Sequence, residues 1–198
     1  MQTGGNRKLL GHGSLMTWQP NGNLILYIYN YIDIKLYGIK PDGTDVVILS
    51  ENYAGHRSIS PDGTKIAFST ELDSQMKIIV LNYPEFNNPK YCGPSGAIHP
   101  TFSPSGDKIA FSMKDYSKKS NDIYEISSDG SNLRQITNNS SDMGYVYPAW
   151  SPDEKKIIFL AISHNSPQIW NLYMINRNGT NLHKVIDDNS VTSCDWCE

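Results

Sequence analysis

The stretch Ser58–Thr70, SISPDGTKIAFST, decides the fold, because closely similar residues return at Pro100–Met113 (PTFSPSGDKIAFSM) and at Pro148–Ala161 (PAWSPDEKKIIFLA). The serines before the repeated prolines lie 43 and 48 residues apart, at Ser60, Ser103 and Ser151. A fourth copy, TWQPNGNLILYIY, places Gln19 at the serine position, 41 residues before Ser60. A period of this length is typical of four-stranded β-propeller blades.

Each repeat predicts the same four short strands. An aromatic or aliphatic residue ends the first strand, and a turn of the Pro-Asp-Gly kind follows, in which proline presets φ and glycine takes a positive φ. The second strand is apolar almost throughout, as expected of a strand covered on both faces, and Ala67 and Ala110 leave room for close blade packing. The third strand ends at an Asp-Gly or Asn-Gly hairpin, except in the second repeat, where the segment 82–91 replaces it. No segment keeps a 3.6-residue apolar period, so we expect an all-β fold.

The segments PAWSPD, KIIF and IWNLYMINRNGTNLHKV together resemble the TolB-type, WD-like propeller repeat, and the clearest copy spans residues 99–137. The resemblance extends from about residue 5 to Trp196. It implies a propeller of four-stranded antiparallel blades. It says little about function, because similar blades serve as binding platforms, enzyme gates and lyase scaffolds.

We expect residues 1–198 to form one propeller region with repeats at about 15–55, 56–98, 99–146 and 147–190. The flanking segments 1–14 and 191–198 match single strands of neighbouring blades. Two such strands sharing a blade would not be adjacent, and their backbone groups would lack partners. The sequence therefore favours four blades of a larger propeller, with a closed four-blade ring as the alternative.

The composition narrows the class of partner. The formal net charge is -3 and no Lys/Arg cluster is longer than a pair, so we expect no nucleic acid partner. The first residues lack the apolar core of a signal peptide, and no apolar stretch is long enough to cross a bilayer, so we expect no membrane insertion.

Cys194 and Cys197 have the spacing of a redox or half-zinc site but lack the strand–helix context or second pair that such sites need.

Two histidines are the first candidate site residues. His56 and His99 each lie four residues before the repeated serine, so they occupy equivalent places on the innermost strands of adjacent blades. The same column contains Leu15, Tyr147 and Ser193. Two imidazoles can ligate a metal ion or orient an anionic group, and the resemblance includes propeller lyases that hold a metal with channel histidines. No third ligand lies in register, so we expect neither metal nor cofactor. We favour a structural hydrogen-bonding role for the histidines, with binding of a ligand or partner as the alternative.

The irregular segments 82–96 and 115–122 supply the second set of candidates, because propeller loops often carry binding specificity. Tyr83, Phe86 and Tyr91 are expected to form an exposed aromatic patch for a partner, or else to cover the edge of their own blade. Tyr29 and Tyr31 are open to the same two interpretations. The serine of the repeated turn is structural, because Gln19 replaces it in one copy.

We therefore predict a non-catalytic propeller scaffold that binds a protein, a small ligand or a glycan, with no catalytic residue in this chain. The resemblance implies a periplasmic or extracellular setting. One alternative is the substrate-gating propeller of a prolyl-oligopeptidase-like serine peptidase, whose Gly-x-Ser-x-Gly elbow does not occur in these 198 residues. A metal-assisted polysaccharide lyase propeller, which depends on the two histidines, is the other.

Overall fold

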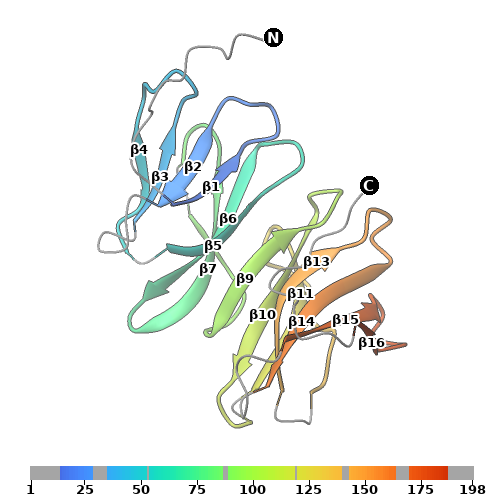
Figure 1. The fold of residues 1–198 in the computed structure, drawn as a ribbon. Helices are drawn as coiled ribbons and strands as arrows, with labels where there is room; N and C mark the ends of the chain where they lie inside the picture. The colour runs from blue at the N-terminus through green and yellow to red at the C-terminus, as the bar shows by residue number, and fades with distance from the viewer. Residues whose placement is uncertain are drawn as a thin grey trace. The chain divides into compact units, whose positions relative to one another are not determined.

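The computed structural model describes residues 14–28, 35–52, 54–86, 89–118, 120–139, 143–163 and 170–186. These ranges contain β-strands and no helix. The strands form four sheets of four strands each, and every sheet uses four strands that are consecutive in the chain (Figure 1). Neighbouring strands pair antiparallel. The all-β prediction of four propeller blades is confirmed.

The strand bounds follow the repeat. Blade 1 consists of β1 (Ser14–Trp18), β2 (Ile25–Ile28), β3 (Leu36–Ile39) and β4 (Val47–Ser50). Blade 2 consists of β5 (Ala54–Ile59), β6 (Lys65–Leu72), β7 (Gln75–Asn82) and β8 (Lys90–Cys92). Blade 3 consists of β9 (Ala97–Phe102), β10 (Lys108–Asp115), β11 (Ser120–Ser127) and β12 (Arg134–Gln135). Blade 4 consists of β13 (Met143–Trp150), β14 (Lys156–Ser163), β15 (Trp170–Asn176) and β16 (His183–Ile186).

Blade 1 belongs to one compact unit, Met1–Ala54, and blades 2 to 4 belong to a second, Gly55–Glu198. Within blade 1, the rings of Tyr27 and Tyr37 stack across β2 and β3 with centroids 5.4 Å apart. A Cβ at Gly38 would lie 3.1 Å from the Val47 side chain, so glycine permits the close packing of β4 on β3.

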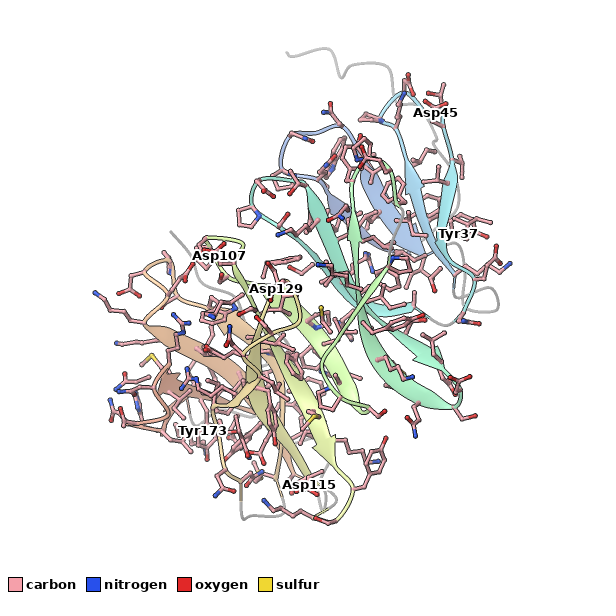
Figure 2. The ribbon with its side chains drawn as sticks, turned by 180° about the vertical axis from the view of Figure 1, so that it is seen from behind. Tyr37, Asp45, Asp107, Asp115, Asp129 and Tyr173 are labelled. Carbon is pink, nitrogen blue, oxygen red and sulfur yellow. The ribbon has the colours of Figure 1, made fainter. Side chains whose placement is uncertain are left out.

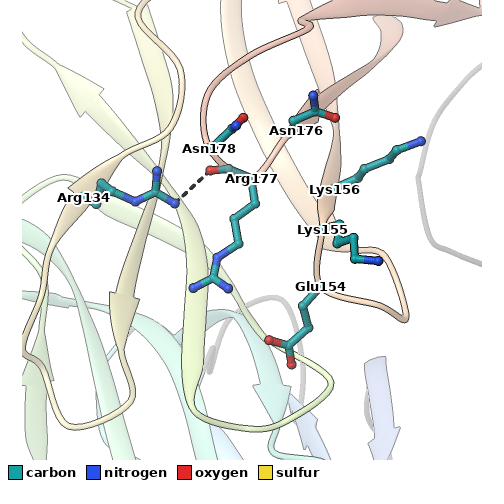
Figure 3. Close-up of a pocket in the computed structure, with 7 residues that line it drawn as sticks. All are labelled: Arg134, Glu154, Lys155, Lys156, Asn176, Arg177 and Asn178. Atoms are coloured by element: carbon teal, nitrogen blue, oxygen red, sulfur yellow. Dashed lines mark hydrogen bonds between the residues drawn. The ribbon is translucent and has the colours of Figure 1, made fainter.

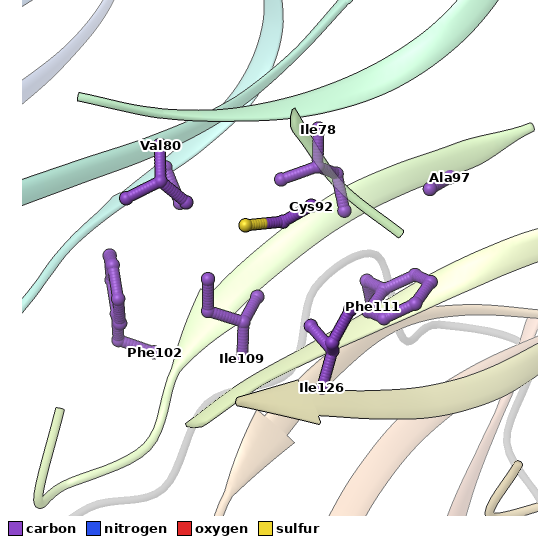
Figure 4. Packing of buried hydrophobic residues seen from close by; sticks show 9 residues of the cluster. Ile78, Val80, Cys92, Ala97, Phe102, Ile109, Phe111 and Ile126 are labelled. Atoms are coloured by element: carbon purple, nitrogen blue, oxygen red, sulfur yellow. The ribbon is translucent and has the colours of Figure 1, made fainter. Parts of the chain in front are cut away.

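Blades 2 and 3 share a core in which side chains from both blades interdigitate (Figure 4). Ala67 is fully buried there, at the place where the sequence predicts that a small residue allows two blades to approach. The buried members of this cluster are Ala67, Ile78, Val80, Cys92, Ala97, Phe102, Ile109, Phe111 and Ile126. Burial of such side chains contributes roughly 1.5–3 kcal/mol each, so this interface is a main source of stability.

Blades 3 and 4 share a second core of the same kind. Ala110 takes the place in it that Ala67 takes in the first, opposite larger residues of the next blade. Its buried members are Ala110, Ile123, Ile136, Tyr145, Trp150, Ile157, Phe159, Ala161 and Ile175. The repetition of one packing pattern explains why the repeated segments carry alanine and isoleucine at fixed places.

The repeated Ser-Pro-Asp turn is held by its own side chains. The Ser60 hydroxyl donates to Asp62 Oδ1 at 2.6 Å and accepts from the Lys65 amide at 2.8 Å, and the Thr64 amide donates to the same Oδ1 at 2.9 Å. The turn at Ser151 repeats the pattern, with a 2.7 Å bond to Asp153. These hydroxyls therefore close a hairpin, which is the structural role that the sequence predicts for them.

Candidate functional site

The innermost strands of blades 3 and 4 each contain an extra residue. β9 carries it at His99–Pro100 and β13 at Tyr147–Pro148, where the register with the next strand shifts by one residue. His99 and Tyr147 both have a φ of 55°. A positive φ in a residue other than glycine costs on the order of 1 kcal/mol, and β-bulges of this kind change the direction of a side chain. The two residues thus leave the regular ladder at the same depth in adjacent blades.

Three rings from three neighbouring blades meet at this depth. The His56 and His99 centroids lie 4.4 Å apart in an edge-to-face arrangement, and Tyr147 stacks on His99 at 4.0 Å. Tyr147 also contacts His56 edge-on at 4.8 Å. The structure therefore brings together the two histidines that the sequence places at equivalent positions, and adds the tyrosine of the same column.

These rings line a cavity of about 210 Å³, which we call the inner-strand cavity. Each of β5, β9 and β13 contributes three consecutive residues to its wall, namely 56–58, 99–101 and 147–149. Two side-chain hydrogen bonds tie the strands together beside it. The Phe102 amide donates to Ser58 Oγ at 3.0 Å, and the Trp150 indole donates to the Thr101 carbonyl at 3.3 Å. The walls of the cavity are thus fixed by bonds between blades.

Burial determines the charge state of the cavity. Burial, assisted by the neighbouring His56, lowers the pKa of His99 to about 3. Partial desolvation, assisted by the charge of Arg57, also lowers the pKa of His56. Burial lowers the pKa of Arg57 to about 10. At neutral pH both imidazoles are therefore uncharged and the guanidinium remains positive.

Among the described residues of this cavity, two polar atoms have no hydrogen-bond partner. His99 Nδ1 and Arg57 Nε are both shielded from solvent and unsatisfied. Arg57 forms no ion pair with any residue in the described ranges. Shielded polar groups in folded proteins are nearly always hydrogen-bonded, so unsatisfied groups beside a cavity mark a place where a ligand can supply the partner.

The imidazoles of His56 and His99 are the groups of this cavity that could ligate a metal ion. Within the part of the chain that the structure describes, no three His, Cys, Asp or Glu side chains gather closely enough to hold a metal ion. His56 and His99 thus have each other and Tyr147 as ring neighbours, and no acidic ligand was found to join them among these residues.

The aromatic residues of segment 82–96 lie in two separate parts of blade 2. Tyr83 and Phe86 pack edge-to-face at 5.5 Å in the turn after β7, where the Tyr83 amide donates to the Thr64 carbonyl. Tyr91 lies instead on the outermost strand β8, is 59% exposed, and has the Lys77 ammonium 5.9 Å from its ring centroid. No ring contact joins Tyr91 to the other two among the described residues.

The second irregular segment, 115–122, lies at the other end of its blade. Figure 2 shows Asp107 and Asp129 in turns at one end of blade 3 and Asp115 in the hairpin at the opposite end. Asp115 accepts from the Ser117 amide and hydroxyl at 2.9 and 2.6 Å, so hydrogen bonds within the turn hold its shape. Several other residues singled out from the sequence lie outside the described residues: Tyr29, Tyr31, Ser193, Cys194 and Cys197, and the side chain of Leu15.

A second hollow, of about 580 Å³, is lined by Arg134 of blade 3 and by residues 154–156 and 176–178 of blade 4 (Figure 3). Two of its lining residues bind the buried Glu125, which accepts from Arg134 at 3.1 Å and from Arg177 at 2.8 Å, and Arg134 also donates to the Arg177 carbonyl. Burial acts to raise the pKa of Glu125, but the hydrogen bonds from Arg177 and Arg134 outweigh it and hold the pKa below its usual value.

Sequence reasoning missed this ion cluster, which joins two blades. The only signal was an acidic residue within the apolar strand IYEIS, which requires a partner if it is buried. Both arginines form ion pairs with Glu125, so these residues connect the two blades and we assign them a structural role.

Comparison with solved structures agrees with the four-blade propeller fold described above. No protein-family model matches the sequence, and no curated protein sequence does. Among solved structures, a proposed TolB from Agrobacterium tumefaciens matches with a TM-score of 0.71 and 18% identity, over 88% of this chain and 66% of that one. TolB from Acinetobacter baumannii matches with a TM-score of 0.68 and 18% identity, over 86% of this chain and 42% of that one.

An oligogalacturonate lyase from Vibrio parahaemolyticus also matches, with a TM-score of 0.64 and 12% identity, over 86% of this chain and 52% of that one. At these identities the likeness concerns the fold alone. The chain spans between 42% and 66% of the length of the three structures.

Proposed function

The chain has a TolB-like β-propeller fold, and from that premise we propose that it is a non-catalytic scaffold that binds a protein partner or a small ligand, glycans included. The proposed binding site is the inner-strand cavity. One observation carries the proposal: three blades direct His56, His99 and Tyr147 to one cavity that contains shielded polar atoms without partners. A bound group would satisfy those atoms.

The rigidity of the cavity walls supports a binding role. Each wall is a strand bonded within its own blade and joined to the next blade by a side-chain hydrogen bond. Groups held in place before binding lose little conformational entropy on binding. The strained φ at His99 and Tyr147 is consistent with this role, because such strain is concentrated at functional sites.

The cellular location of the protein and the class of its partner are part of the same proposal. We propose a periplasmic or extracellular location on the basis of the TolB-like fold, and a protein or ligand partner with no nucleic acid. No helix in the described ranges is long and apolar enough to cross a membrane. We also propose that the repeats at 15–55, 56–98, 99–146 and 147–190 belong to one larger propeller, which the greater length of the matched structures supports.

The two alternatives receive less support. The peptidase-gate alternative needs a hydrolase domain joined to the propeller, and no feature of the described residues favours it. The lyase alternative needs a metal site, and the described residues offer no group of three ligands. The likeness to the Vibrio lyase, at 12% identity, supports only the shared fold.

Affinity capture from a bacterial envelope extract, with quantified bound proteins and glycans, tests the proposal. The four baits are the wild-type chain, His99→Ala, Phe86→Ala, and His183→Ala as a control on the exposed strand β16. We expect at least one captured component to be lost with His99→Ala and retained with His183→Ala. A component lost only with Phe86→Ala would move the site to the turn after β7. Identical capture by all four baits would contradict the proposal.

A further inference from the structure

Arg57 is the unusual residue of the inner-strand cavity. The equivalent positions in blades 1, 3 and 4 are Met16, Pro100 and Pro148, so the repeat does not need a cation there. Arg57 is half-buried, its Nε is shielded, and no carboxylate in the described ranges pairs with it. Arginine is seldom held away from solvent without a partner, because the desolvation of its charge is costly.

His99 also has a shielded polar atom without a hydrogen-bond partner. Its Nδ1 is shielded and unsatisfied, and Tyr147 stacks on the ring at 4.0 Å and holds its orientation. A neutral imidazole carries one N–H donor, and the tautomer with the proton on Nδ1 can offer it to an acceptor. The cavity thus holds a guanidinium Nε and an imidazole Nδ1 that both lack an acceptor, and no acidic side chain is present among the described residues of its wall.

Resting on the proposed function of this cavity, we propose that it binds the carboxylate of an acidic ligand, with Arg57 as the ion partner and His99 as a hydrogen-bond donor. A planar carboxylate matches the fork of a guanidinium. Arg57 is the one positive residue among the described residues of the wall, so it balances the one charge of a carboxylate, whereas a phosphate dianion would leave an uncompensated charge. The volume of about 210 Å³ is below the usual range for whole cofactors and suits a small acidic group.

The test is an NMR titration of the full chain with sodium acetate at constant ionic strength, which follows the imidazole resonances of His56 and His99. Acetamide is the uncharged probe of similar shape, and inorganic phosphate is the competing anion. We expect saturable shifts with acetate and none with acetamide, and weaker binding of phosphate. Bound acetate is also expected to raise the pKa of His99, because a nearby negative charge favours the protonated ring.

Three variants assign the effect to Arg57. Arg57→Gln is expected to weaken acetate binding about tenfold or more, and Arg57→Lys, which keeps the charge without the planar fork, is expected to weaken it less. Lys155→Gln removes an exposed cation away from the cavity and is expected to bind acetate as the wild type does. The amide spectrum of each variant verifies folding, and Arg57→Lys provides the comparison if Arg57→Gln does not fold.

Acetate binding that is absent, unchanged in both Arg57 variants, or weaker than phosphate binding would overturn this inference. The result of the acetate titration can be distinguished from the result of the affinity capture that tests the proposed function. If His99→Ala loses a captured component but acetate does not bind, the cavity is a binding site for a different chemistry. If neither effect is found, both proposals fail.

Discussion

The indole of Trp150 donates from Nε1 to the carbonyl oxygen of Thr101, 3.3 Å away on the innermost strand of the neighbouring blade. Trp150 is 6% exposed and belongs to the core between blades 3 and 4. The same ring has the Arg177 guanidinium 5.5 Å from its centroid. One side chain therefore joins the wall of the inner-strand cavity to the apolar core and to the ion cluster around Glu125.

Replacement of this ring should lower the free energy of unfolding. Trp150→Phe removes the donor to Thr101 and leaves a partly filled space, and we expect a loss of about 2 kcal/mol in urea unfolding. Trp18→Phe is the matched control, because Trp18 occupies the equivalent place in blade 1 but is 60% exposed. We expect the control to cost less than about 0.5 kcal/mol. Equal losses for the two variants would contradict the role given to Trp150.

Removal of the Glu125 charge should weaken the contact between blades 3 and 4. Glu125→Gln keeps the shape but loses charge-assisted hydrogen bonds to Arg134 and Arg177, and we expect a loss of about 2 kcal/mol at pH 7. Glu51→Gln breaks an exposed pair with Lys35 and should cost less than about 1 kcal/mol.

The Glu125 effect should depend on pH. Because its folded pKa is lowered, the stabilisation is complete above the unfolded pKa of about 4.3 and is lost as the pH falls through the folded value. Unfolding curves of wild type and Glu125→Gln should therefore converge at low pH. A difference that stays constant from pH 7 to the acid range would refute an ionic origin.

His99 should make the fold less stable as the pH falls below about 6.5. Its pKa in the folded state is about 3, so the unfolded chain binds more protons between these values and stability decreases on acidification. From pH 6.5 to pH 5 the loss attributable to His99 is at most about 2 kcal/mol. We expect His99→Gln to lose less stability over this interval than wild type, with His183→Gln as the control. Parallel curves for wild type and His99→Gln would show that the ring titrates normally.

Gly179 should be sensitive to substitution for two reasons. It has a φ of 87°, and a Cβ there would lie 3.1 Å from the backbone oxygen of Ile136 in the preceding blade. Gly22 has a φ of 74° but nothing within 4 Å of such a Cβ. Gly22→Ala is therefore expected to cost about 1 kcal/mol through the backbone alone, and Gly179→Ala more than that. If thermal unfolding shows that the two substitutions lower the free energy of unfolding equally, the contact with Ile136 does not contribute to the effect.

The repeat predicts much of this structure. The period and the Ser-Pro-Asp turns define four sheets, since each turn closes with its own side chains, as at Ser60 and Asp62. The proximity of His56 and His99 was predictable, because equivalent residues of adjacent blades meet at the same depth.

Other features depend on contacts that no local pattern encodes. Arg57 is distinctive because no acidic residue in the described ranges pairs with it, and Glu125 because its partner Arg177 lies 52 residues away. The expected aromatic patch likewise depends on where the chain turns after β7, which places Tyr91 on an outer strand apart from Tyr83 and Phe86.

The extra residues in β9 and β13 make this part of the fold suitable for engineering. Because His99 and Tyr147 stand outside regular strand pairing, the ladder hydrogen bonds on either side place few demands on their side chains. Their positive φ favours glycine, asparagine and aspartate as replacements. A library of substitutions at positions 56, 99 and 147 would therefore vary the lining of the proposed binding cavity on a constant framework, much as antibodies vary their loops on a constant sandwich.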